Sequence, residues 1–538
     1  MSKTQKNFLS GAIILSVANI LVKIIGGIYK IPLVWLMGGT GMGYYNDAYQ
    51  IYAMLFIIST AGIPVAISKM VSESNTLNRT KEPKKILKIA VISFAIIGFI
   101  GMAVMVLGVR VFTMVIKNPN ADLSIIAIAP AIFFVSMTSA FKGYFQGYKN
   151  MTPTAVYQII EAIAKLIGLG IVAFLISMGY KENYRVLAAG AVLGVSFGSF
   201  CSAIFMFLRY FFGKKEVINE TNYVKSRTTS TILAQIIKIA IPVTLSSAVM
   251  SLTSFIDMVF VKRSLNSIAS FTVEKANFYY GSFTGCCYSL FNLPTAITLT
   301  VGVSVLPFIS SALAGGNKDE AHRHMKSSMK VVSLLAMPCV TGLFFMARPI
   351  LNFLYSSRPD EVSIAILPMR ILALSIFFVS FVSLLNVILQ ASGKVNIPMY
   401  TMFAGAVAKI FINVTLVRIP SININGAPIG SFCCYGLIVL LDLIFIKKYT
   451  GFTMPFKNIV LKPLLCAIAC GATGISVYLL LEKISVNLYI STMISLVVAV
   501  IVYVICVIGF KILEKDDIML LPKGDKIYSL LNKRGLIK

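Results

Sequence analysis

Four lysines stand inside long apolar stretches of the sequence, where an ammonium group costs about 2.5 to 3.5 kcal/mol on membrane-insertion scales. Lys23 lies near the middle of the apolar run 9–36, roughly 20 Å along a helix axis from either end at 1.5 Å per residue. A lysine stem does not cover that distance, so Lys23 must meet water or a partner. Because ammonium groups attract anions, lysines at this depth indicate a site for a negatively charged ligand.

The same run carries a polar stripe. Lys30 follows Lys23 after seven residues, which places both on nearly the same face of a helix, and Ser16 and Asn19 fall on that face at helical spacing. We therefore expect Asn19, Lys23 and Lys30 to contribute to one binding site.

Two further lysines end segments that resemble each other. Residues 146–165 and 390–409 each begin with Gln, pass through a Pro and end in Ala-x-Ala-Lys, so Lys165 and Lys409 occupy matching positions. The segments lead into apolar runs that lie six runs apart, the spacing of a duplicated six-helix unit. Such repeats share one orientation, and their interface is the expected place for a substrate cavity.

The acidic residues leave alternatives open. Glu161 stands four residues before Lys165, so the two side chains can instead form a structural ion pair. Asp47 follows a glycine-rich segment at the start of the second run, and Asp257 lies in the seventh, where it either binds a coupling cation or pairs with a lysine. Arg370, in the tenth run, either reaches the membrane surface or faces the interior.

With these assignments, a site containing Lys23, Lys30, Lys165 and Lys409 against Glu161 carries a net positive charge. Such a site suits an anionic ligand, and above all a phosphate with several charges, because each ammonium group offers several donors. The substrate-binding set predicted from the sequence is completed by Asp47 and Asn19, and Asp257 is the candidate for ion coupling.

The elements that hold these residues are membrane-spanning helices. Hydrophobic residues make up 57% of the 538 residues, charged residues only 13%, and the mean hydropathy is +0.86. A helix needs about 20 apolar residues to cross the hydrocarbon core. Fourteen runs are long enough: 9–36, 48–68, 86–109, 124–147, 154–178, 186–208, 232–260, 279–310, 330–350, 363–389, 398–416, 427–446, 460–481 and 488–510.

The net charge of +28 does not require a nucleic-acid partner. With the N-terminus inside and the runs alternating, most of the Lys and Arg residues outside the spans fall on the inner side. This distribution predicts a multi-pass protein of the cytoplasmic membrane with both termini in the cytoplasm and its positive charge facing anionic lipid.

Little in the sequence suggests catalysis. The loops between runs are short, the nine Cys are scattered through apolar runs, and the two His share one basic loop. We therefore expect no enzyme activity, no catalytic residue, no metal site and no bound cofactor.

Several stretches closely resemble one known family. These are "FKGYFQGYKNMTPTAVYQIIE" (141–161), "GGIYKIPL" (26–33), "GIPVAISKMVSE" (62–73) and "LPTAITLTVGVSVLPFIS" (293–310). They are similar to the polysaccharide biosynthesis, stage V sporulation protein B-like branch of the MATE-like MOP flippase superfamily, which includes lipid II flippases. The resemblance implies an all-α fold with two pseudo-symmetric six-helix lobes, a cationic cavity, and a groove formed with two additional C-terminal helices.

The family pattern transfers only in part. Lys23 and Lys30 fall where lipid II flippases use arginines, and Asp47 falls where they have an aspartate. Those flippases carry a further arginine just before a Leu-Pro in the eighth helix, where this sequence has Ser289. The identity of the substrate is thereby left open.

From the repeat and the resemblance we expect an N-lobe at 1–230, a C-lobe at 231–458, two helices at 459–512 and a basic cytoplasmic tail at 513–538. The expected function is flipping of an undecaprenyl-pyrophosphate-linked glycan, lipid II or a related wall or polysaccharide precursor, by alternating access. The alternatives are a cation-coupled multidrug exporter of the same superfamily and a scaffold for wall or spore-cortex assembly that transports nothing.

The expected partners are the lipid-linked glycan, membrane lipids and enzymes of cell-wall synthesis, and the expected state is a monomer. Na⁺, H⁺ or the membrane potential would drive the cycle.

Overall fold

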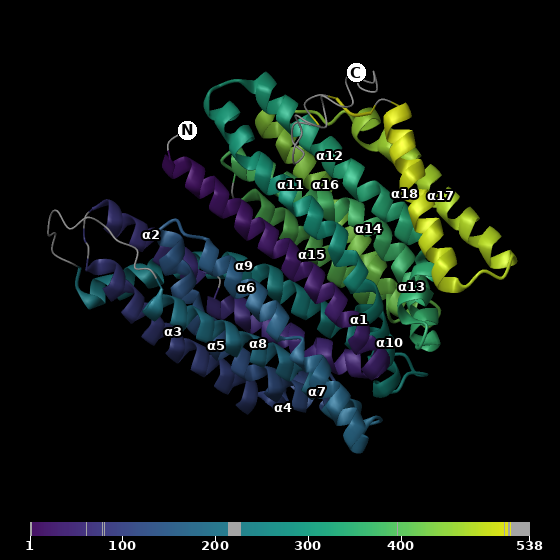
Figure 1. Cartoon of the computed structure of the whole chain (residues 1–538), viewed down its shortest axis with the longest axis horizontal. Helices are drawn as coiled ribbons and strands as arrows, with labels where there is room; N and C mark the ends of the chain where they lie inside the picture. The colour runs from purple at the N-terminus through teal and green to yellow at the C-terminus, as the bar shows by residue number, and fades with distance from the viewer. Residues whose placement is uncertain are drawn as a thin grey trace. The chain divides into compact units, whose positions relative to one another are not determined.

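The computed structural model describes residues 3–60, 62–77, 79, 81–213, 227–394, 396–510, 512–514 and 517. Within these ranges every regular element is a helix (Figure 1). Most of the predicted basic tail 513–538 lies outside the described residues.

The contacts divide the chain into two units, of which the first contains residues 1–266 and 270–281. Its elements are α1 (Lys3–Thr60), α2 (Gly62–Thr76), α3 (Glu82–Leu107), α4 (Val109–Val115), η1 (Pro119–Ala121), α5 (Asp122–Gly147), α6 (Thr152–Ala164), α7 (Ile167–Leu175), η2 (Ile176–Tyr180), α8 (Tyr184–Phe212), α9 (Thr229–Asn266) and α10 (Val273–Ser282).

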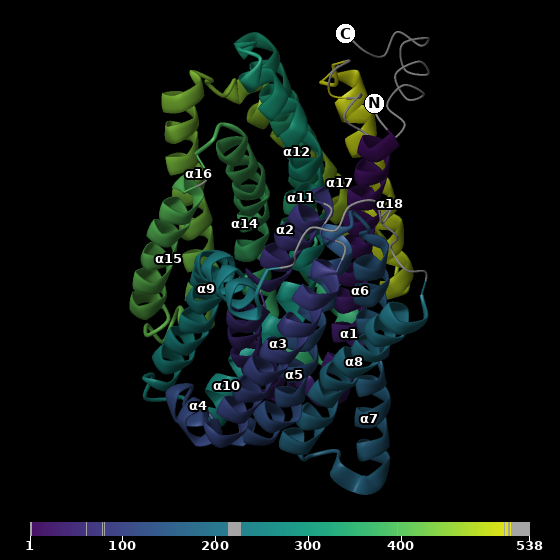
Figure 2. The ribbon, with the colours of Figure 1, turned by 90° about the vertical axis from the view of Figure 1, so that its left-hand side faces the viewer.

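The second unit contains residues 267–269 and 282–538. Its elements are η3 (Phe283–Cys287), α11 (Tyr288–Ala314), α12 (Lys318–Phe345), α13 (Ala347–Tyr355), α14 (Pro359–Ala391), α15 (Ile397–Leu416), η4 (Asn423–Asn425), α16 (Gly426–Thr450), η5 (Lys457–Leu461), α17 (Lys462–Lys483) and α18 (Leu488–Gly509). Figure 2 shows α15 beside α16 and α17 beside α18.

Eleven helical stretches within the described ranges are long and apolar enough to cross a membrane. One of them, 17–76, contains most of the first predicted run and all of the second. Predicted runs 232–260 and 279–310 coincide with α9 and with α10 to α11. The all-helical, multi-pass fold class is therefore confirmed, whereas the count of fourteen spans stays a prediction.

The first two predicted runs are joined without an intervening loop. Two helical segments of α1 meet directly at a kink at Gly38, whose φ of 60° and ψ of −169° lie where only glycine is comfortable. The glycine-rich segment before Asp47 is consequently a bent helix, and Asp47 lies after the bend, where it contacts Lys262 on α9 and Asn118 just before η1.

Packing groups α9 and α10 with the helices that precede them. Gly62 allows α2 to approach α9 so closely that a methyl group at position 62 would lie 2.1 Å from the carbonyl oxygen of Ala240. The lobe boundary predicted at residue 230 rests on the sequence repeat and stays a prediction, because repeat symmetry and packing are separate properties.

In the second unit, the segment after α18 is anchored to α12. Lys330 is buried and its Nζ donates to Glu514 Oε1 at 2.7 Å and to Asp517 Oδ2 at 2.8 Å. Ser327 Oγ donates to the other carboxylate oxygen of Asp517 at 2.6 Å, and Lys326 forms a second ion pair with Glu514 at 3.2 Å. These contacts supply acceptors for the buried ammonium group of Lys330 and hold the segment after α18 against α12.

Candidate functional site

The predicted helix 154–178 is interrupted at Lys165. α6 ends at Ala164, α7 begins at Ile167, and Lys165 is the C-cap residue of α6. A cation at the C-terminal end of a helix is stabilised by the helix dipole and by the last free carbonyl groups. The break therefore gives a local reason for a lysine in the middle of an apolar segment.

Glycine residues allow the segment between α6 and α7 to pack closely against α8 and α1. A methyl group at Gly198 would lie 2.7 Å from the Glu161 carbonyl oxygen, and one at Gly194 would lie 2.5 Å from the Lys165 carbonyl oxygen. On α7, a methyl group at Gly168 would meet the hydroxyl of Tyr29 at 2.5 Å. Only hydrogen at these positions allows backbone to pack on backbone, so the place of Lys165 is set by its neighbours.

Lys165 lies over α1. Its Nζ is 5.3 Å from the ring centroid of Tyr29 and 3.6 Å from the position that a methyl group on Gly26 would take. Tyr29 is buried and donates its hydroxyl hydrogen to the carbonyl oxygen of Ala191 at 3.0 Å. The ammonium groups of Lys165 and Lys30 are close enough to repel each other.

Glu161 supplies the carboxylate that lies near these lysines. Glu161 interacts electrostatically with both Lys165 and Lys142, and its Oε1 accepts a hydrogen bond from Ser199 Oγ at 3.3 Å. Lys142 Nζ lies 3.8 Å from the ring centroid of Tyr157, a cation–π contact. We call Lys30, Lys142, Lys165 and Glu161 the cationic cluster.

Three ammonium groups against one carboxylate leave the cationic cluster with an excess of positive charge. Among the described residues, Glu161 and Lys165 form no salt bridge within 4 Å, so the alternative of a closed ion pair is not the one adopted. Half-buried lysines that are only partly neutralised can bind a polyvalent anion at low cost. The free-energy cost of removing water from their ammonium groups arises when the protein folds, and not when the anion binds.

Lys23 and Asn19 lie further toward the N-terminus on α1, and both are exposed. They share the helix face of Lys30 by spacing, as predicted, but they make no described contact with the cationic cluster. Their role in binding stays a prediction.

Asp47 lies in a separate, closed network. It is fully buried and paired with Lys262, and Asn118 Nδ2 donates to its Oδ2 at 2.6 Å. Asn277 Oδ1 accepts from Lys262 Nζ at 2.9 Å, and Asn277 Nδ2 donates to the carbonyl oxygen of Thr40 at 2.9 Å. Direct contact between Asp47 and a ligand would require this network to open, and that part of the predicted site stays a prediction.

Asp257 and Lys409 are half-buried on α9 and α15, in the first and second units respectively. Each interacts with other parts of the protein, so neither is an unpartnered charge. The equivalence of Lys409 with Lys165 rests on the sequence repeat.

Comparisons with known proteins decide the family. The model of a family described as "Polysaccharide biosynthesis protein" matches residues 8–313, more than half of the chain. The chain belongs to this polysaccharide biosynthesis protein family. A second family model, MatE, matches residues 282–415, and the two together confirm the predicted place in the MATE-like MOP superfamily.

Curated relatives match over almost the whole length. Stage V sporulation protein B of Bacillus subtilis (strain 168) is 24% identical over 524 residues, covering 96% of this chain and 98% of the relative. Lipid II flippase MurJ of the same organism is 24% identical over 498 residues, covering 88% of each. A solved structure of lipid II flippase MurJ, in an inward closed conformation, matches 93% of this chain and 98% of its own with a TM-score of 0.70 at 15% identity.

The lipid II flippase relatives and the two family models place the chain among the transporters of the MOP superfamily, and it passes the membrane many times. The departure from the family pattern at Ser289 is visible in the structure. Ser289 is buried and donates to the carbonyl oxygen of Gly285 at 3.1 Å, which closes one turn of the helix rather than offering a charge.

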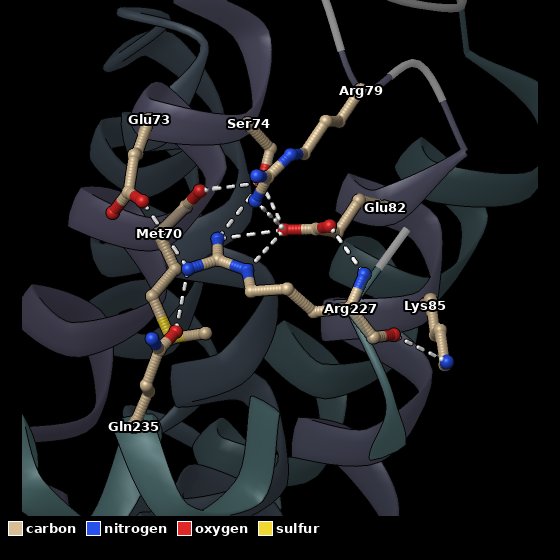
Figure 3. A network of polar contacts seen from close by, with 8 residues as sticks. All are labelled: Met70, Glu73, Ser74, Arg79, Glu82, Lys85, Arg227 and Gln235. Atoms are coloured by element: carbon tan, nitrogen blue, oxygen red, sulfur yellow. Dashed lines mark hydrogen bonds and ion pairs between the residues drawn. The ribbon is translucent and has the colours of Figure 1, made fainter. Parts of the chain in front are cut away.

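Figure 3 shows a polar network at the ends of α2 and α3. The carboxylate of Glu82, which is fully buried, accepts from Arg227 Nε at 2.6 Å and from the Arg227 backbone N–H at 2.8 Å. Arg227 also pairs with Glu73 at 3.2 Å and donates to Gln235 Oε1 at 2.6 Å. Arg227, which lies just before α9, is thereby tied to the C-terminal end of α2 and the N-terminal end of α3.

Sequence reasoning missed Lys142, Lys262 and the Glu82–Arg227 pair, because each lies at or beyond the end of an apolar run and looked like an ordinary surface charge. A signal existed for Lys142: it falls inside the 141–161 stretch that carries the family resemblance, as does Glu161. The partner of Asp47 had no local signal, since Lys262 is 215 residues away.

Proposed function

We propose that this transporter flips an undecaprenyl-pyrophosphate-linked glycan, lipid II or a related wall or polysaccharide precursor, across the cytoplasmic membrane. The observation that carries the proposal is the cationic cluster: inside membrane-spanning helices, Lys142 and Lys165 interact with the one carboxylate of Glu161, and Lys30 lies near Lys165. A diphosphate is the part of such a substrate that requires positive charge, and the lipid tail can stay in hydrocarbon.

Two features of the cationic cluster suit a diphosphate. Lysine binds phosphate as a point charge with three donors, so several lysines can share one polyvalent group without a fixed geometry. Tyr29 and Tyr157 hold the aromatic faces against which Lys165 and Lys142 rest when no anion is bound. Cation–π contacts are weaker than a phosphate contact, so the lysines can exchange one for the other.

The transport cycle then needs alternating access. The substrate diphosphate binds the lysines from the inner leaflet, the two lobes rearrange, and the head group leaves toward the outer leaflet. Na⁺, H⁺ or the membrane potential resets the empty carrier; moving one elementary charge through 100 mV is worth about 2.3 kcal/mol.

A cation-coupled multidrug exporter is the second candidate, favoured by the MatE match over 282–415. Organic cations need acids and aromatic faces, whereas the cationic cluster offers more ammonium groups than carboxylates. A scaffold that transports nothing is the third candidate. It gives no reason for lysines within spans, so it predicts that their replacement by glutamine is harmless.

Reconstituted flipping separates these candidates. We expect purified protein in vesicles to expose fluorescent lipid II on the opposite leaflet, with rival lipid-linked glycans and a cationic dye as competitors. Lys165→Gln and Lys142→Gln should each slow flipping roughly tenfold or more, as expected when a charge-assisted contact is lost. Lys181→Gln, at an exposed lysine of the same unit, should leave the rate unchanged. Equal rates for all variants, or competition by the dye alone, would contradict the proposal.

A further inference from the structure

The second unit contains a cavity of about 390 Å³ that neither the repeat nor the cationic cluster uses. It lies between the end of α12, the start of α13, α14 and the C-terminal half of α17. Phe344, Phe345 and Leu479 supply apolar walls, and two arginines, Arg348 and Arg370, supply the cations.

Neither arginine is paired with a carboxylate among the described residues, although Arg348 interacts electrostatically with the phenol of Tyr478. Among the described residues, neither Arg348 nor Arg370 takes part in a hydrogen bond or a salt bridge, and the Nε of Arg370 is buried with no acceptor. A guanidinium group presents five donors in a planar fork, and a buried donor without an acceptor is costly. The buried Nε of Arg370, together with the exposed guanidinium group of Arg348 at the same cavity, indicates that an acceptor with several oxygens completes it.

Glu482, the acidic residue that lines the cavity, already accepts a hydrogen bond from Tyr478. Glu482 lies at the exposed rim, and Tyr478, one helical turn earlier on α17, donates its hydroxyl hydrogen to Glu482 Oε1 at 3.4 Å. Within the described part of the chain Glu482 forms no salt bridge with either arginine. The cavity therefore keeps an excess of positive charge. The first turn of α13, which carries Arg348, adds the positive end of a helix dipole.

The surroundings point to a lipid rather than a soluble ligand. Arg370 stands eleven residues after the start of α14, roughly 16 Å along the axis at 1.5 Å per residue, within a helix that is long and apolar enough to cross a membrane. Leu479 and Leu480 on α17 are 49% and 60% exposed, so apolar surface continues from the cavity along the helix. Acyl chains can cover this surface while the head group fills the cavity.

We propose that Arg348 and Arg370 bind the phosphate of an anionic membrane lipid in this cavity. Arg370 contacts the phosphate from the buried side and Arg348 from the rim, and the paired donors of each guanidinium match two phosphate oxygens. Glu482 limits the affinity by repulsion, which allows the lipid to exchange. The site is contained in the second unit and does not depend on the substrate proposed for the cationic cluster.

The test uses full-length protein in neutral detergent. Binding of phosphatidylglycerol, phosphatidylcholine and inorganic pyrophosphate is measured by native mass spectrometry and by the shift in melting temperature. We expect phosphatidylglycerol to bind more tightly than phosphatidylcholine. Arg370→Gln and Arg348→Gln should each weaken that binding roughly tenfold or more, the loss expected for one charge-assisted contact. Arg418→Gln is the matched control, because Arg418 is an exposed arginine of the same unit outside the cavity.

Glu482→Gln provides a variant with the opposite sign, which keeps the test decisive if loss of an arginine impairs folding. It should tighten phosphatidylglycerol binding several-fold. Lys165→Gln should slow flipping without changing this binding, so the two proposals can fail separately. Equal binding to the Arg348→Gln/Arg370→Gln double variant and the parent would overturn the site. Pyrophosphate binding as tight as that of the lipid would overturn the assignment to a lipid.

Discussion

Lys262 and Asp47 form a salt bridge in which both side chains are closed to solvent, with exposures of 3% and 0%. Two amides complete it, since Asn118 donates to the carboxylate and Asn277 accepts from the ammonium group. The pair joins α1 to α9 within the first unit, although 215 residues separate the partners.

Removal of one partner should therefore be costly. Lys262→Met leaves a buried carboxylate with one amide donor, and we expect a loss of about 3 to 5 kcal/mol of unfolding free energy, the usual cost of half a buried pair. Thermal unfolding of detergent-solubilised protein measures it. The double variant Asp47→Asn/Lys262→Met should recover part of the loss. A single variant as stable as the parent would show that the pair contributes nothing net.

Glu82 and Glu73 offer a matched comparison, because both contact Arg227 but differ in burial. Glu82 is fully buried and holds the Arg227 backbone as well as its side chain, whereas Glu73 is 45% exposed. Glu82→Gln should cost about 1 to 3 kcal/mol, and Glu73→Gln about 1 kcal/mol or less. Hydrogen exchange at the start of α9 should quicken in the Glu82 variant alone. The reverse order would contradict this account.

The contact between Glu514 and α12 should depend on pH. Burial acts to raise the pKa of Glu514, but the hydrogen bonds and charges of Lys330 and Lys326 outweigh it and lower the pKa from its usual 4.5. A lowered pKa in the folded state means that the contact is at full strength above pH 4.5 and weakens as the pH falls through the folded-state value. Hydrogen exchange of residues 512–517 at several pH values follows the change. In Glu514→Gln this dependence should be much reduced, and a contact that tightens as the pH falls below 4.5 would contradict the assignment.

Gly198 and Gly170 test how Lys165 is positioned. A methyl group at Gly198 would lie 2.7 Å from the Glu161 carbonyl oxygen, while one at Gly170 meets nothing within 4 Å. Gly198→Ala should displace the end of α6, cost about 1 to 3 kcal/mol and slow flipping. Gly170→Ala should be neutral or stabilising by up to about 1 kcal/mol. Melting temperature and vesicle flipping measure both, and equal behaviour of the two variants would show that helix contact at Gly198 is not what fixes Lys165.

Asp442 is a buried carboxylate in α16, and within the described part of the chain neither of its oxygens has a hydrogen bond of good geometry. The hydroxyl of Thr401 lies close enough to Asp442 to interact with it, and it also donates to the carbonyl oxygen of Pro398 at 3.2 Å. Asp442→Asn removes the ionisable group from an apolar site, and we expect a gain of about 1 to 3 kcal/mol in unfolding free energy. A lower melting temperature for Asp442→Asn would contradict this expectation.

Local sequence sufficed for the membrane class and the all-helical fold class, because hydropathy and helical spacing act over one or two turns. The family followed from short stretches such as 141–161, which encode contacts that relatives share. Tertiary structure decided the partners. Asp47 forms a buried ion pair with Lys262. Lys142 interacts with Glu161 and is not simply a charge in a solvated loop. Arg348 and Arg370 line the same cavity. Each of these depends on how distant helices pack, and a charge near the end of an apolar run looks the same whether it faces water or another helix.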